Sequence, residues 1–157
     1  MDIAAITAHV EGLGGVLTLA PREGDGTPEL AWGDLFFYYA PDGVLPPGQP
    51  FATVVTKDYP DDTGSRLDRP GAFRVNIAAG RTAYRAHVGH DPGEEDQDVD
   101  PAAEDTVLPH PVYGPLGWLA VVNPGPATEE TVRALLRTAH GLARARRDRR
   151  GTGASEE

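Results

Sequence analysis

The sequence predicts one α+β domain, in which an antiparallel sheet packs against an N-terminal helix and a long C-terminal helix. Short runs with the alternation or the β-branched content of strands recur between residues 16 and 122, and turns rich in glycine and proline separate them. Apolar residues at helical spacing flank these strands at both ends of the chain. The length of 157 residues suits a single hydrophobic core, so we expect one domain over residues 1–150.

The N-terminal helix is predicted to begin after Asp2, whose carboxylate can cap it, and to end at the glycine-rich stretch 12–15. Its apolar positions are Ile3, Ile6, Val10 and Leu13. Strands are predicted over residues 16–20 and 35–39, with the turn-rich segment 21–28 between them. The second strand is an aromatic run, so its large side chains are expected to cover both faces.

Two further strands are predicted in the middle of the chain. Residues 51–56 have the β-branched content of a central strand. Residues 72–78 alternate, which predicts a half-buried strand with Arg74 and Asn76 pointing outward. The polar segment 57–70 between these strands is expected to be a loop ordered by its own side-chain hydrogen bonds.

The C-terminal half is predicted to contain a short helix over residues 81–88, a strand over 119–122 and the longest helix, capped by Thr128. The long helix carries an apolar stripe formed by Val132, Leu135, Leu136, Ala139, Leu142 and Ala143. Five arginines in residues 144–150 complement its negative end. Residues 151–157 are expected to be a disordered tail.

The negative charge of the chain is concentrated in one segment. The formal net charge is −10, and residues 89–106 contain eight acidic residues and no lysine or arginine. High charge and low complexity predict an acidic flexible loop there; the alternative is an interaction segment or a partner for the arginines of residues 144–150. The overall acidity makes nucleic acid an unfavourable partner and argues against an anionic membrane.

Cysteine is absent from the chain, which excludes disulfides and a cysteine nucleophile and fits a reducing compartment. No apolar run approaches the length of a membrane span, and we expect a cytoplasmic protein. None of the five histidines is paired at the spacing of metal ligands, so neither a metal site nor a cofactor is predicted.

Two segments carry side chains that suit a binding site. The first is the loop 57–70 with the strand after it, where Lys57, Arg66, Arg69 and Arg74 offer positive charge to a carboxylate or a phosphate. The alternative is a loop in which Asp58 and Asp68 pair with these cations over the sheet edge. The full set of candidate ligand-binding residues is Lys57, Asp58, Tyr59, Arg66, Arg69, Arg74, Asn76, His110, Tyr113 and Trp118.

The second segment is residues 108–118, where three prolines predict a stiff turn that presents His110 and Tyr113. These two side chains, with Arg74 as an anion stabiliser, are the candidate catalytic residues. The alternative is a loop whose aromatic side chains cap the core, with His110 bonded to a backbone carbonyl.

The order and spacing of several motifs resemble known families. The opening Met-Asp-Ile helix, the segment Pro-Glu-Leu-Ala-Trp-Gly-Asp before the aromatic strand, and the closing Gly-Trp strand and long helix resemble the MmcQ/YjbR-like double-wing proteins. The motifs Thr-Lys-Asp-Tyr-Pro, Leu-Asp-Arg-Pro-Gly-x-Phe-Arg-x-Asn-Ile and His-Pro-Val-Tyr-x-x-x-Gly-Trp are similar to an uncharacterised actinobacterial domain family. The first resemblance implies an antiparallel sheet with flanking helices, in a class suspected of binding DNA.

The sequence therefore favours a non-catalytic binding or accessory domain, a monomer or homodimer, that recognises a small anionic molecule or a protein partner. One alternative is a small enzyme of secondary metabolism that uses His110 as its acid or base. The other is a DNA-binding double-wing domain, which the acidity of the chain opposes.

Overall fold

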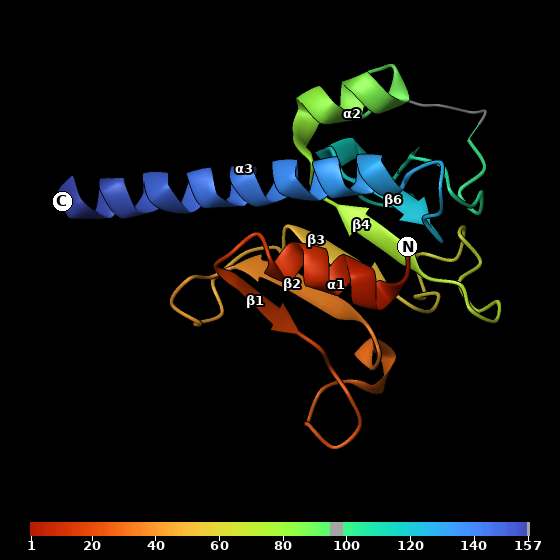
Figure 1. Ribbon diagram of the computed structural model, residues 1–157, viewed down its shortest axis with the longest axis horizontal. Helices are drawn as coiled ribbons and strands as arrows, with labels where there is room; N and C mark the ends of the chain where they lie inside the picture. Colours follow the sequence, from red (N-terminus) through yellow and green to blue (C-terminus); the bar gives the residue numbers. More distant parts are fainter. Residues whose placement is uncertain (95–98, 157) are drawn as a thin grey trace.

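Six antiparallel strands form one sheet in the described part of the chain, in the order β1-β2-β3-β4-β6-β5 (Figure 1). The strands are β1 (Val16–Leu19), β2 (Leu35–Tyr39), β3 (Ala52–Val55), β4 (Arg74–Ile77), β5 (Leu108–Pro109) and β6 (Leu119–Val122). The structure is a computed structural model that describes residues 1–94 and 99–156, with side chains as far as residue 150. The predicted α+β class, with an antiparallel sheet between N- and C-terminal helices, is confirmed.

One face of the sheet is covered by α1 (Ile3–Glu11) and α3 (Glu129–Glu156), and α3 extends past the edge of the sheet (Figure 1). The core between these layers contains Ile6 and Val10 of α1, Val132, Leu136 and Ala139 of α3, and Val54, Val75 and Val121 of the central strands. As predicted, Asp2 caps α1: its Oδ1 accepts a hydrogen bond of 2.8 Å from the Ala5 amide.

The opposite face of the sheet is also covered, by loops that include the short 3₁₀ helices η1 (Glu29–Ala31) and η2 (Gly114–Leu116). The register aligns Phe36, Thr53 and Asn76 in one row on this face. Arg74 and Asn76 are each only 2% exposed, so the prediction that they point outward into solvent is wrong. Alternation assigned them to the correct side of the strand, but residues 57–70 and 108–118 fold back over that side and bury them.

The turn that precedes α3 (Glu129–Glu156) differs from the prediction in one respect. Thr128 precedes the helix as predicted, but its hydroxyl donates to Asp105 Oδ1 (2.6 Å). The same carboxylate accepts from the amides of Gly125, Ala127 and Thr128 at 2.8–3.0 Å. Asp105, from the acidic segment, therefore fixes the turn at residues 125–128 that leads into α3. Thr128 occupies the N-cap position, because its carbonyl accepts from the Val132 amide at 2.8 Å.

Two predictions concern segments that are only partly described. Residues 95–98 lie outside the described residues, so an acidic flexible loop over 89–106 stays a prediction. The helix α3 extends to Glu156, but the side chains after residue 150 lie outside the described part, and a disordered tail over 151–157 also stays a prediction.

The short helix α2 (Gly80–Val88) agrees with expectation. Of the helices in the described ranges, none is both long and apolar enough to cross a membrane.

Candidate functional site

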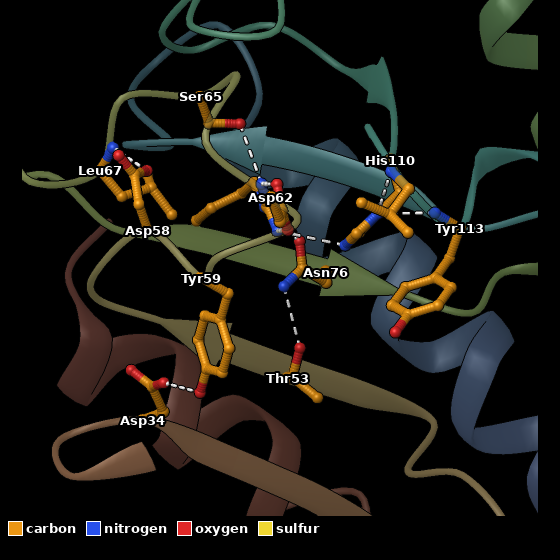
Figure 2. Close-up of polar contacts among 12 residues, drawn as sticks. Asp34, Thr53, Asp58, Tyr59, Asp62, Ser65, Leu67, Asn76, His110 and Tyr113 are labelled. Carbon is orange, nitrogen blue, oxygen red and sulfur yellow. Dashed lines mark hydrogen bonds and ion pairs between the residues drawn. The ribbon is translucent and has the colours of Figure 1, made fainter. Parts of the chain in front are cut away.

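The candidate site is a cleft of about 490 Å³ between the loop-covered face of the sheet and the loops themselves. Aromatic side chains make up much of its lining: Phe36 and Tyr38 lie on the sheet, and Tyr59, Tyr113 and Trp118 come from the covering loops and form the walls. Its floor is polar and is formed by Thr53, Arg74, Asn76 and His110. Figure 2 shows the floor residues Thr53, Asn76 and His110 between the rings of Tyr59 and Tyr113. A cleft of this size with few convergent polar groups has the dimensions of a small-molecule site.

Arg74 organises the floor of the cleft. Its Nη1 and Nη2 donate to the two carboxylate oxygens of Asp62 at 3.0 and 2.5 Å. Nη1 also donates to Ser65 Oγ (2.9 Å), and Nε donates to Asn76 Oδ1 (2.6 Å). The bidentate carboxylate compensates the charge of the buried guanidinium, which would otherwise be very costly. Burial raises the pKa of the Asp62 carboxyl, but the hydrogen bonds and charge of Arg74 outweigh this and hold the pKa below its usual value.

A chain of hydrogen bonds runs from Arg74 across the sheet. Because Nε of Arg74 donates to Asn76 Oδ1, the amide of Asn76 is oriented with its Nδ2 toward β3. Nδ2 then donates to Thr53 Oγ1 at 2.9 Å (Figure 2). Thr53 Oγ1 thus accepts a bond, and no described residue accepts one from its hydroxyl hydrogen. The hydroxyl lies on the floor of the cleft, so this hydrogen is available to a molecule bound there.

His110 is held by its own loop in one tautomer. Its Nδ1 accepts hydrogen bonds from the amides of Val112 (3.0 Å) and Tyr113 (2.9 Å). A neutral imidazole carries one hydrogen, and with Nδ1 as acceptor this hydrogen is on Nε2. Burial and the charge of Arg74, which Asp62 partly opposes, together lower the pKa of His110 to about 3, so the ring is neutral at pH 7.

The tautomer matters because it determines what Nε2 can offer to its neighbour Arg74 and to a bound molecule. Nε2 lies 3.2 Å from Arg74 Nη2, and a guanidinium nitrogen has no lone pair to offer. The two N–H groups therefore meet donor to donor at the floor of the cleft. An oxygen bound in the cleft could accept the Nε2 hydrogen, which the guanidinium cannot do.

A second buried cluster anchors the wall that carries Tyr59. Asp34, which is fully buried, accepts from the amide and the hydroxyl of Thr56 at 2.8 and 2.7 Å. It also accepts from Lys57 Nζ (3.2 Å) and from Tyr59 Oη (2.5 Å). Burial, followed by the hydrogen bond to Asp34, raises the pKa of the Tyr59 hydroxyl well above its usual value. The ring of Tyr59 is thereby fixed along one side of the cleft.

The structure brings together most of the residues proposed for binding and excludes the others from the cleft. The cleft is lined by Tyr59, Arg74, Asn76, His110, Tyr113 and Trp118. Lys57 instead binds Asp34 and the Trp32 carbonyl, and Arg69 donates to backbone carbonyls.

Asp58 and Asp68 bind backbone amides of their own loop, and not the cations that the sequence suggested. Arg66 is exposed on the same loop, outside the lining of the cleft. In the described part of the chain, no three histidine or acidic side chains converge as ligands for a metal ion.

A comparison with protein families places this site in context. The sequence matches the model of a family of unknown function, DUF6194, over residues 1–152. The chain belongs to this family. Neither a curated protein nor a solved structure matches it. The expected membership of a family without an assigned activity is therefore confirmed, and the function has to be argued from the cleft.

Sequence reasoning missed four residues that build the site: Asp34, Thr53, Asp62 and Ser65. Thr53 had a detectable signal, since it is the polar residue in the middle of an apolar central strand. Asp34 directly precedes an aromatic strand, which places a charge at the edge of the core. Asp62 and Ser65 lie in the polar loop and have no local pattern that distinguishes them. Only the fold places them beside Arg74.

Proposed function

We propose that this chain is a small-molecule binding domain whose ligand occupies the cleft on the loop-covered face of the sheet. The observation that carries the proposal is a buried polar network, Asp62–Arg74–Asn76–Thr53 with His110, at the floor of an open cleft with aromatic walls. A buried ion pair is rarely the most stabilising choice for a fold. Its position under a cleft of ligand size supports a role in recognition.

The partners of the cations oppose the expectation that the ligand is an anion. Of the four cations expected to clamp an anion, Lys57 and Arg74 are paired with carboxylates, and Arg69 is bound to carbonyls. Recognition in the cleft therefore relies on aromatic contacts and hydrogen bonds. A protein partner, the other expectation, would meet the rim of the cleft at Tyr113 and Leu116, which are 50% and 75% exposed.

Fragment screening by NMR tests the proposal. Small aromatic fragments added to ¹⁵N,¹³C-labelled protein are expected to perturb the Thr53 methyl, the Trp118 indole and the Tyr113 amide together. Tyr113→Ala should weaken this binding, because it removes one wall of the cleft. Leu45→Ala is the control, since Leu45 is similarly exposed but lies outside the cleft. A library in which no fragment perturbs these three signals would contradict the proposal.

A second candidate is a small enzyme, and the observation in its favour is the 3.2 Å distance between Arg74 Nη2 and His110 Nε2. In the tautomer described above, His110 donates a hydrogen bond and does not accept a proton. A catalytic His110 would then polarise a substrate oxygen, as a neutral imidazole can do. Mass spectrometry of a metabolite extract incubated with the protein should show a mass change that His110→Asn abolishes. An unchanged extract counts against the enzyme.

A further inference from the structure

The ligand class can be narrowed by the hydrogen-bonding directions at the floor of the cleft. We infer that the ligand is an uncharged, planar ring compound that presents an acceptor oxygen, such as a carbonyl, to Thr53 Oγ1 and His110 Nε2. This inference rests on the proposed function, because it assumes that the cleft binds a small molecule. It goes further by specifying the charge and the polarity of that molecule.

The inference that the ligand carries an acceptor oxygen follows from two buried hydrogen-bond donors, which are oriented by different neighbouring groups. Thr53 is 9% exposed, and the Arg74–Asn76–Thr53 chain leaves its hydroxyl hydrogen directed away from Asn76. His110 is 5% exposed, and its two backbone donors place its hydrogen on Nε2. Both side chains line the same cleft. A buried donor without an acceptor is unfavourable, so a bound oxygen would satisfy groups that the fold leaves in need of one.

The absence of a formal charge on the ligand follows from the charged groups of the cleft. Among the described lining residues these are Arg74, Asp61 and Asp62, with His110 neutral. An anion would approach two carboxylates, while Arg74, the one cation among the described lining residues, already holds Asp62 in a bidentate pair. A cation would be repelled by the guanidinium and would face N–H and O–H donors. A neutral acceptor avoids both penalties.

The inference that the ligand contains a planar ring follows from the aromatic walls of the cleft. The rings of His110, Tyr113 and Trp118 form a cluster with centroid distances of 5.0 Å for His110–Tyr113 and 6.3 Å for each ring to Trp118. Tyr59 is fixed on another side by its bond to Asp34. Rigid aromatic surfaces at these positions favour a flat ring, which can stack or meet them edge to face.

Four one-ring probes of similar size separate the possibilities: acetophenone (neutral acceptor), ethylbenzene (no acceptor), benzoate (anion) and benzylamine (cation). Their dissociation constants for the full chain are measured by NMR titration at pH 7. Acetophenone is expected to bind about tenfold more tightly than ethylbenzene, as two modest hydrogen bonds would provide. It should also exceed benzoate and benzylamine.

Variants test which groups give this preference. Thr53→Val removes the hydroxyl on a strand that suits valine, and Thr53→Ser restores it; the preference for acetophenone should fall in the first and return in the second. Thr63→Val is the control on an exposed position. In His110→Asn, the amide oxygen can still accept from the Val112 and Tyr113 amides, but the Nε2 donor is lost and the preference should fall.

Direct observation of the tautomer makes the inference independent of variant folding. The ¹⁵N resonances of His110 at pH 7 should show the proton on Nε2. Protonation of Nδ1, or equal binding of ethylbenzene and acetophenone, would overturn the inference while leaving the proposed binding function intact. Failure of all four probes to perturb the cleft would contradict the inference and the binding function together.

Discussion

Replacement of His110 by asparagine should remove a pH dependence of stability that the buried ring confers on the protein. The ring is neutral in the folded state because burial and the charge of Arg74 lower its pKa to about 3, from 6.5 for the free side chain. Below pH 6.5 the unfolded chain binds a proton that the folded chain does not bind. The free energy of unfolding therefore falls as the pH falls through the window between the two pKa values.

The size of the effect follows from these two pKa values. Between pH 7 and pH 5, linkage predicts that His110 removes about 2 kcal/mol from the free energy of unfolding. Asparagine does not titrate, and its side-chain oxygen can take the place of Nδ1 as the acceptor for the amides of Val112 and Tyr113. The stability advantage of the wild-type protein over His110→Asn should thus shrink by about 2 kcal/mol over this range.

Urea denaturation at pH 7, 6 and 5, followed by circular dichroism, measures this difference. Carboxylates titrate in both proteins, so the comparison isolates position 110. His87→Asn serves as the control for removing a histidine from an exposed position. If the difference between wild type and His110→Asn did not change between pH 7 and pH 5, the assignment of a buried, neutral His110 next to Arg74 would be refuted.

Three further perturbations test the rest of the structure. Arg74→Met should destabilise the protein by about 3–5 kcal/mol, measured by urea denaturation, because Asp62 loses its partner; a loss below 1 kcal/mol would contradict a buried pair. Asp34→Asn should cost about 2–4 kcal/mol and release the Tyr59 ring, seen as line broadening in NMR. Asp105→Asn should lower the melting temperature at pH 7 and lower it less at pH 3. Hydrogen bonds from Thr128 and from backbone amides lower the pKa of Asp105 in the folded protein. The stability that the carboxylate contributes is therefore lost as the pH falls through that pKa. Equal losses at both pH values would exclude a charged carboxylate at the turn before α3.

The local elements were largely predictable, because each depends on residues close together in the chain. Asp2 marked the start of α1, and the apolar stripe after Thr128 indicated α3. Strand β5 was missed, since a strand of two residues that includes Pro109 has no periodicity to detect. Thr128 precedes α3 as predicted, but nothing in the sequence shows that Asp105 binds its hydroxyl.

The candidate site was predictable only in part. The motif segments pointed to Arg74, Asn76, His110 and Tyr113, and these side chains do meet in one cleft. The expectation of an anion clamp came from counting cations in a loop, which does not reveal their partners. The tautomer of His110 likewise depends on the two amides that its turn directs at Nδ1.

Local patterns were enough to predict the α+β class, the two flanking helices and the segments that carry the polar residues, because periodicity, capping residues and turn residues act over a few positions. Which of those residues are buried, and what each one binds, depends on contacts between segments far apart in the chain. Asp62, Ser65 and His110 approach Arg74 only because two loops fold over the same face of the sheet. Burial then determines the charge state of His110 and the direction of its donor, because both depend on the groups that replace water around the ring.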